Sequence, residues 1–326
     1  MLIVTYGRGK LIENALISLV NQSLKPDEVV IVLKPSGDCS EQVISEFSDR
    51  LNLKIVLQNE GGFVDALFMG INDASGDILL FLDDDAIAHT EWILRFEKLF
   101  EEYKDVGGIT GFIKKADVNG GNIVLKDDPF YDEKCAEGPH RKPLKILENY
   151  DEYFATSGLL GLSCKCLEQD KSIIKSTLLA GLNMGFKLNL IKEYPLTLVY
   201  KGSRIGWWWE NFIALNVVLR GYDTSSVRPP SIAPIVYHTV NVSSLTRGKG
   251  FGQEFWASFD RSISYWRLKM FGVKVNFLWY LLGQAIIVRR KPLPRLIAFF
   301  YTFFTGLFYY IKYKNQVRRF FTNKII

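Results

Sequence analysis

The chain has 326 residues, of which 48% are hydrophobic and 23% charged, and its formal net charge is +5. This composition excludes an intrinsically disordered chain and predicts a globular protein, large enough for one extended α/β domain with an appendage. Much of the basic excess flanks apolar, aromatic stretches near the C-terminus. That distribution argues against a nucleic-acid binder, which spreads its charge over a folded face, and favours contact with an anionic membrane surface.

The first 82 residues alternate short apolar runs with segments of helical periodicity. The apolar runs predict strands at 2–5, 28–33, 53–57 and 77–82. The periodic segments predict helices at 10–22, 40–50 and 61–73. Such alternation indicates βαβ units and a mainly parallel, Rossmann-like sheet with helices on both faces. Sheets of this kind bind ligands at the carboxyl ends of their strands.

The last of these strands ends directly on three aspartates, Asp83, Asp84 and Asp85. Like charges this close raise one another's pKa unless a cation offsets them. Hard carboxylate oxygens are the ligands that Mg²⁺ and Mn²⁺ prefer, and such an ion would bridge the two phosphates of a nucleotide-sugar. The alternative is a solvated acidic turn, but the position at the end of a buried strand favours a metal site.

The middle of the chain is less regular. Residues 114–150 are polar and rich in Gly, Asp and Lys, which indicates a variable insertion. A helix is predicted from Gly206 to Arg220, with three tryptophans at its start and Gly221 beyond its end. A strand predicted at 235–237 then leads to His238.

Two residues of this half are candidates for chemistry. Glu210 follows the tryptophans, and a carboxylate against an apolar wall has a pKa suited to a general base; the alternative is an acid that interacts with the helix dipole. The tryptophans themselves either stack on acceptor sugars or belong to the core. His238 precedes a polar loop, which favours a functional over a structural role. In that loop, Arg247 and Lys249 are candidate contacts of a diphosphate, with a solvated loop as the alternative.

Aromatic residues crowd the chain from about residue 251 onward. Two uncharged stretches, 275–288 and 296–311, hold 14 and 16 residues and are separated by a basic segment. A spanning helix needs about 20 residues, so helices lying in the membrane interface are expected, with core helices or a short hairpin that dips into the bilayer as alternatives. Because the chain starts on a strand without a signal peptide, the expected location is the cytoplasmic face of the cell membrane.

An ordered set of motifs resembles the inverting glycosyltransferase family 2, which has the GT-A fold. The set comprises the opening strand and turn at 3–8, the helix at 15–23, the turn at 59–62, the run from Ala74 to Asp85, and Glu91–Ile93. Farther on, Trp209–Asn211 resembles the family's acidic motif and Val236–His238 its late strand. The C-terminal helices resemble those of rhamnosyl- and galactofuranosyl-type members.

The resemblance implies an organisation and an activity. It places a GT-A domain at 1–250, with a nucleotide-binding half at 1–113 and an acceptor half at 114–250, and a membrane-associating region at 251–326. It implies transfer of a sugar from a nucleotide-diphosphate-sugar, most simply a UDP-sugar, to a glycan or to a polyprenyl- or other lipid-linked acceptor, with Mg²⁺ or Mn²⁺ as cofactor.

The resemblance also assigns residues. The implied nucleotide contacts are Thr5, Tyr6, Arg8, Asn59, Gly61, Asp83 and Asp84. Asp85 is the implied main metal ligand, together with Asp83 and His238. Glu210 is the implied base that deprotonates the acceptor hydroxyl.

Two departures from the family pattern leave other functions open. The family usually has an aspartate, often the base, where this chain has Asn211, which cannot accept the proton. An early aspartate that contacts uracil in the family is absent from Leu33–Asp38, where Leu33 and Lys34 stand instead. Asn211 argues for a non-catalytic nucleotide- or glycan-binding protein. The loop Tyr6–Lys10 faintly suggests a nucleotidyltransferase, but the later motifs do not.

Overall fold

The structure is a computed structural model. The residues it describes are 1–119, 122–129, 144–145, 153–154, 173–227, 230–239, 250–273, 275, 277–289 and 292–322.

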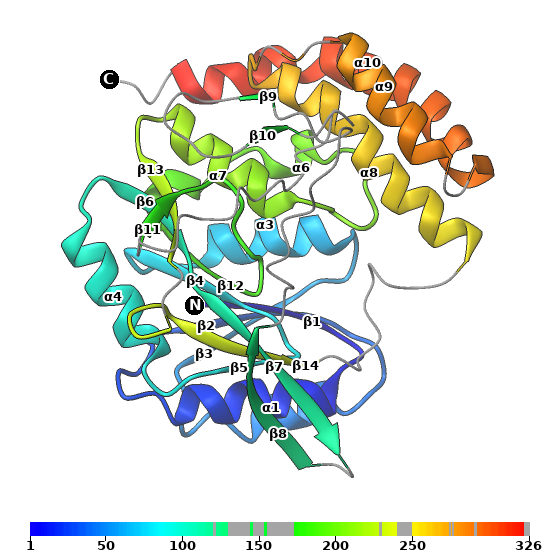
Figure 1. Ribbon diagram of the computed structural model, residues 1–326. Coiled ribbons are helices and arrows are strands. Elements are labelled where there is room, and N and C mark those ends of the chain that lie inside the picture. The colour runs from blue at the N-terminus through cyan, green and yellow to red at the C-terminus, as the bar shows by residue number, and fades with distance from the viewer. Residues whose placement is uncertain are drawn as a thin grey trace.

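An eight-stranded sheet crosses the middle of the molecule (Figure 1). Its strands, in spatial order, are β11 (Ile173–Lys175), β13 (Asp223–Val227), β6 (Val106–Thr110), β12 (Asn183–Lys187), β4 (Ile78–Leu82), β1 (Leu2–Tyr6), β2 (Val29–Lys34) and β3 (Leu53–Leu57). Strands β4, β1, β2 and β3 are mutually parallel, whereas β12 runs antiparallel to both β4 and β6. The carboxyl ends of the four parallel strands therefore lie along one edge.

A second sheet of four strands lies next to this edge. It has the order β5 (Ala86–Ala88), β14 (Ile235–Thr239), β7 (Phe112–Asn119) and β8 (Asn122–Pro129). Strand β14 is antiparallel to β5 and parallel to β7, and β7 and β8 form an antiparallel hairpin. A separate short pair consists of β9 (Leu144–Lys145) and β10 (Tyr153–Phe154).

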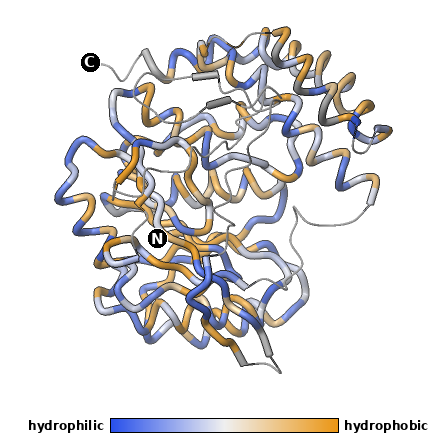
Figure 2. Tube along the Cα trace, viewed as in Figure 1, coloured by the Kyte–Doolittle hydropathy of each residue, from blue (hydrophilic) through white to orange (hydrophobic). Residues whose placement is uncertain are grey.

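Helices cover both faces of the large sheet. On one face lie α1 (Gly9–Val20), α2 (Ser40–Ser45) and α4 (Trp92–Glu102). On the other lie α3 (Phe63–Asp73), α5 (Leu188–Ile191), α6 (Leu196–Val199) and α7 (Trp209–Leu219). Alternate residues of one strand point to opposite faces of the sheet. Ile3 of β1 therefore packs in the core beneath α1, α2 and α4, and its neighbour Leu2 packs in the core beneath α3, α5, α6 and α7. The strands inside the molecule are largely hydrophobic, shown in orange in Figure 2, so both faces of the sheet must be shielded from water.

The C-terminal helices form an outer layer over α6 and α7 (Figure 1). They are α8 (Phe251–Met270), α9 (Phe277–Val288) and α10 (Pro292–Thr322). Helix α10 approaches α8 closely because Gly306 has no side chain: a Cβ there would lie 2.1 Å from Cδ1 of Trp266. Leu268 and Val317 belong to the same core cluster as α3 and α7, so this layer is packed onto the domain.

The predicted α/β fold is confirmed, with local differences. Helix α2 ends at Ser45, five residues before the predicted end, and turns follow. His238 lies inside β14 rather than after it. The segment expected to be an insertion from 114 contains most of the β7–β8 hairpin. Helix α10 starts in the basic segment and is 31 residues long, yet no helix of the described residues is long and apolar enough to span a bilayer.

Candidate functional site

Residues in and just after strand β1 bind the side chains of the acidic cluster. Thr5, the fourth residue of β1, donates its hydroxyl to Oδ2 of Asp84 at 2.8 Å. Arg8 uses one nitrogen, NH1, to contact Oδ1 of Asp84 and Oδ2 of Asp85, both at 2.9 Å. Burial raises the pKa of Asp84 to about 6 although Arg8 and Thr5 act to lower it. The guanidinium therefore ties two of the three carboxylates to the end of β1.

Strand pairing brings His238 to Asp85. Strand β5 starts immediately after the aspartates, and its first residue, Ala86, lies opposite His238 of β14. The next residue of β14, Thr239, donates its hydroxyl to the backbone oxygen of Asp85 at 3.2 Å. As a result, Nε2 of His238 lies 3.3 Å from Oδ1 of Asp85. Burial acts to raise the pKa of Asp85, but His238 and Arg8 hold it below its usual value.

Asp83, Asp85 and His238 together offer a ligand set. One oxygen or nitrogen from each lies within 4.8 Å of the others. Burial, with help from Asp85 and Asp84, raises the pKa of Asp83 to about 7. Oδ1 of Asp85 is buried and accepts no regular hydrogen bond from any described residue. Two carboxylates and an imidazole with these properties suit a hard or borderline divalent cation, because such an ion would satisfy the buried oxygen and offset the clustered charge.

The helix motif at 15–23 has a structural reason. Ser18 Oγ accepts the backbone N–H of Ala88 at 3.1 Å, which fixes β5 against α1. Gln22 donates to the backbone oxygen of His89 at 2.8 Å and accepts the backbone N–H of Ile93 at 3.1 Å. Helix α1 therefore holds the chain on the far side of the aspartates, so the motif positions the cluster without touching it.

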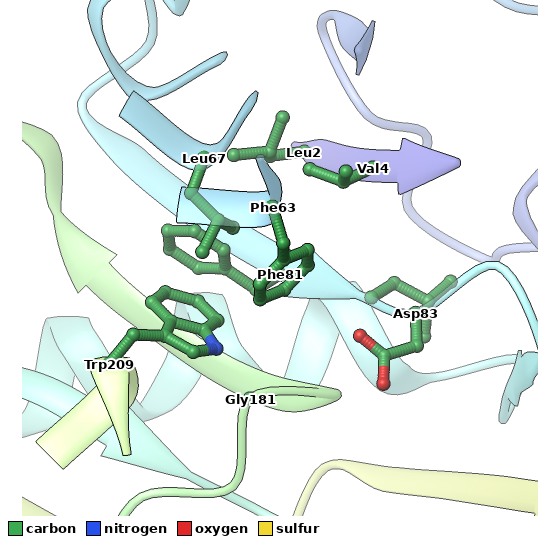
Figure 3. Close-up of a pocket in the computed structure, with 9 residues that line it drawn as sticks. Leu2, Val4, Phe63, Leu67, Phe81, Asp83, Gly181 and Trp209 are labelled. Atoms are coloured by element: carbon green, nitrogen blue, oxygen red, sulfur yellow. The ribbon is translucent and has the colours of Figure 1, made fainter. Parts of the chain in front are cut away.

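Asp83 opens onto a small cavity between the sheet and α7 (Figure 3). Its carboxylate lies at one end, the Trp209 ring at the other, and Phe81 between them. The full lining is Leu2, Val4, Phe63, Leu67, Phe81, Leu82, Asp83, Gly181 and Trp209. The ring of Trp209 packs on Phe81 at 5.3 Å between centroids. Since Trp209 is the first residue of α7, this contact brings the helix that carries Glu210 to the acidic cluster.

Glu210 lies in the first turn of α7, after Trp208, which has a left-handed backbone (φ 64°). Burial raises the pKa of Glu210 to about 7. Its neighbour Asn211 is 3% exposed and donates its side-chain amide to the backbone oxygen of Thr177 at 3.0 Å. An ionised aspartate has no proton to donate there, so the departure from the family pattern accompanies a buried amide–carbonyl hydrogen bond.

The predicted nucleotide contacts at the ends of β1 to β3 are more open. Tyr6 is 59% exposed and Lys34 Nζ lies 5.8 Å from its ring centroid. The same Nζ donates to the backbone oxygen of Gly61 at 2.8 Å, which links the ends of three strands. Asn59 is exposed next to this group. Lys34, which stands where the family has its early aspartate, therefore connects Tyr6 and Gly61 at the ends of neighbouring strands. The sequence did not reveal this role.

Asp38, the acid at the end of the altered segment Leu33–Asp38, has a structural role. Its carboxylate accepts hydrogen bonds from the backbone of Gly9 at 2.9 Å and from the hydroxyls of Ser36 and Ser40. Despite some desolvation, these donors lower its pKa to about 2. Asp38 thus stabilises the starts of α1 and α2. Arg247 and Lys249 lie outside the described residues.

Sequence reasoning also missed a buried pair behind α7. Asp260 is fully buried, and its Oδ2 accepts the backbone N–H groups of Gly206 and Trp207 at 3.0 and 3.1 Å. Its Oδ1 accepts from Arg267 at 2.8 Å, and that guanidinium also donates to Val199 O and stacks on Tyr200. The pair fixes the turn that leads into Glu210. In the sequence they are only two charged residues seven positions apart in an aromatic segment, for which no individual helix was predicted.

The mainly parallel sheet with an antiparallel strand beside β4, and carboxylates at its carboxyl edge, is the architecture of an α/β protein of the GT-A type. Residues 1–168 match Glycosyl transferase family 2. The chain therefore belongs to this family of glycosyltransferases.

Curated and structural relatives agree with that assignment. Validoxylamine A glucosyltransferase of Streptomyces hygroscopicus subsp. limoneus is 30% identical over 97 residues, which are 28% of this chain and 21% of the relative. Glycosyltransferase AglE of Haloferax volcanii is 28% identical over 141 residues, 42% of this chain and 46% of the relative. The alignments thus span less than half of either relative's length. The crystal structure of S. aureus TarS 1–349 with UDP-GlcNAc has a TM-score of 0.55 at 14% identity, over 97% of this chain and 82% of that one, and shares the fold.

Proposed function

We propose that this chain is an inverting, metal-dependent glycosyltransferase that transfers a sugar from a nucleotide-diphosphate-sugar to a glycan or lipid-linked acceptor. The observation that carries the proposal is the cluster of Asp83, Asp85 and His238 at the end of β4, within one short cavity of the helix that bears Glu210. A set of metal-ligating groups and a candidate base at the two ends of one cavity suit sugar transfer from a diphosphate, in which the leaving group needs charge neutralisation and the acceptor hydroxyl loses a proton.

The residues fit Mg²⁺ or Mn²⁺. Asp85 would be the main ligand, with Asp83 and His238 completing the set. When bound, the ion supplies charge neutralisation for the leaving diphosphate. Arg8 has a separate role: it holds Asp84 and Asp85 in place and keeps a positive charge beside the diphosphate position.

The donor would bind over the ends of the parallel strands. Thr5 orients Asp84 toward the ribose side, and the exposed Tyr6 ring, Asn59 and the Gly61 backbone offer contacts for the base and ribose. The TarS structure contains UDP-GlcNAc, which makes UDP-sugars the first donors to test. Lys34 replaces the family's aspartate, so we propose that a cation and a backbone carbonyl, rather than a carboxylate, border the base.

Glu210 is the proposed base. Its pKa near 7 lets it accept a proton from an acceptor hydroxyl at neutral pH, as that oxygen attacks the sugar's C1 from the face opposite the leaving diphosphate. Asn211 holds its amide on Thr177 and takes no part in proton transfer.

Helix α10 would provide the surface that contacts the membrane. Its outward residues form an apolar stripe at helical spacing, and basic residues lie at both ends of it, among them Arg289 and Lys312. The stripe consists of Leu293, Leu296, Ile297, Phe300, Phe304, Phe308 and Ile311, all exposed. This pattern supports attachment of the 251–326 region to the cytoplasmic face of the cell membrane, without a spanning helix.

The test is donor turnover. Purified full-length chain is incubated with UDP-, GDP- and dTDP-sugars, with Mn²⁺, Mg²⁺ or EDTA, and release of the nucleoside diphosphate is measured with and without polyprenyl phosphate acceptors. Metal-dependent release that Asp85→Asn abolishes supports the proposal. Absence of both hydrolysis and transfer with every donor, alongside retained nucleotide binding, would favour a non-catalytic binding protein. Release of pyrophosphate from a nucleoside triphosphate and a sugar phosphate would instead indicate a nucleotidyltransferase.

A further inference from the structure

Two arginines beside the start of α7 stack on tryptophan rings. The guanidinium of Arg261 lies 4.3 Å from the ring centroid of Trp207, and that of Arg204 lies 4.4 Å from the centroid of Trp256. Trp207 precedes Glu210 by three residues. A guanidinium whose face rests on an aromatic ring keeps its N–H edge available, and this edge matches the geometry of a phosphate.

Neither of the two arginines has an acidic partner or a hydrogen-bond acceptor for its side chain within the described residues. Arg267, on the same helix, shows the contrast. It also stacks on an aromatic ring, but its donors are taken by Asp260 and Val199. Arg267 is therefore structural, whereas Arg204 and Arg261 hold donors that an incoming anion can accept from.

The charges that act on Arg261 are those of Arg295 and Glu254, and burial together with Arg295 lowers the pKa of Arg261. The carboxylate of Glu254 is ion-paired with Arg295 at 2.6 Å. The nearby Asp260 carboxylate is bound by Arg267 and by the backbone of Gly206 and Trp207. Both carboxylates are thus engaged by other groups, so an anion that bound Arg261 would stabilise its charge.

The position of this site relates it to the apolar stripe. Arg295 is in the first turn of α10, and its ion pair with Glu254 places the start of α10 beside the start of α8. The exposed stripe begins in the same turn, with Leu293 at 61% and Leu296 at 42% exposure. Arg204 lies on Trp256, two residues after Glu254, and is therefore near the start of the stripe, whereas Arg261 lies on Trp207 in the turn that leads into Glu210.

We infer that Arg204 and Arg261 bind the phosphate of a lipid-linked acceptor, whose hydrocarbon chain lies along the stripe of α10. This inference rests on the proposed function, since it assigns the acceptor of that reaction. Phosphate binding here would hold the acceptor's head group near Glu210 while its chain stays at the membrane. Arg204 is exposed and Arg261 is half-buried, so neither guanidinium is sealed in the core.

Binding of farnesyl diphosphate, inorganic pyrophosphate and farnesol is measured by calorimetry on the full chain in EDTA, which keeps diphosphates from binding through a metal. Wild type should bind farnesyl diphosphate more tightly than either of the others. Arg204→Gln and Arg261→Gln should each weaken that binding about tenfold, the loss expected for a charge-assisted contact. Arg50→Gln is the matched control, because Arg50 also stacks on a ring, Phe47, at 4.3 Å, and lies in the turns that follow α2, on the opposite face of the sheet.

Two results would overturn the inference. One is unchanged farnesyl diphosphate affinity in both arginine variants; the other is equally tight pyrophosphate binding, which would identify a soluble phosphate ligand instead of a lipid. UDP affinity in Mn²⁺ is measured on the same samples and should be unaffected by Arg204→Gln, an exposed position whose change leaves the core intact. If wild type binds farnesyl diphosphate in an arginine-dependent way but turns over no donor, the proposed reaction is refuted and the phosphate site is not.

Discussion

Replacing Glu210 by glutamine is expected to lower the turnover number and to raise the stability of the fold. Burial raises the pKa of Glu210 from 4.5 to about 7, so the folded state disfavours the ionised form that a general base needs. That difference corresponds to about 3 kcal/mol. Because the folded pKa is the higher one, the folded state is penalised as the pH rises from 4.5 through 7 and carries the full penalty above it.

Glu210→Gln removes both the base and the ionisation. Above pH 7 the free energy of unfolding of the variant should exceed that of wild type by up to about 3 kcal/mol, and this difference should vanish near pH 4.5. Its turnover number should fall by about two to four orders of magnitude, the usual contribution of a general base. In wild type, turnover should rise with pH and level off above about 7.

Urea unfolding at pH 5, 6, 7 and 8, run beside donor turnover, measures both quantities. Taking the difference between the two proteins at each pH cancels the titration of Asp83 and Asp84, whose pKa values are raised as well. Glu13→Gln, on the exposed side of α1, is the control and should change neither. A stability difference that stays flat across this pH range would refute the burial argument, and near-normal turnover in Glu210→Gln would exclude this residue as the base.

Three further changes test other parts of the structure. Asp85→Asn should abolish the rise in melting temperature that Mn²⁺ gives to wild type, because it removes the proposed main ligand; an unchanged rise would place the ion elsewhere. Asp260→Asn should lower the free energy of unfolding by about 3 kcal/mol, since it leaves Arg267 buried without a charge partner, and urea denaturation measures this. Gly306→Ala should cost about 1–3 kcal/mol by forcing Trp266 away from α10, whereas Gly252→Ala, where a Cβ meets nothing within 4 Å, should cost no stability; equal losses would contradict the close helix contact.

The sequence predicts those parts of the molecule in which local pattern and tertiary position coincide. The strands β1 to β4 are mostly apolar runs, and the aspartates follow β4 directly, so their place at a sheet edge could be deduced. Strand β12 could not, because its residues, Asn183 to Lys187, carry a buried asparagine and a glycine. Asn183 accepts from Trp92 and donates to the backbone oxygens of Phe112 and Pro234, and these partners come from three separate segments. Such a residue has no signature in its own neighbourhood.

The same limit applies to Asn211 and to the pair of Asp260 and Arg267. From sequence, Asn211 looks like a lost base, whereas in the fold it is a donor to the carbonyl of Thr177. Asp260 looks like one charge on an aromatic helix, yet it binds the backbone of the turn that leads into Glu210. The region from 251 was predicted to associate with a membrane, and this stays a prediction. Its first helix supplies the carboxylate that binds the turn leading into Glu210, so a truncation near Asp260 would remove that support together with the apolar stripe. Membrane attachment is therefore better tested by Phe304→Glu, a single change at a side chain 67% exposed, which should release the protein from anionic vesicles without altering its melting temperature.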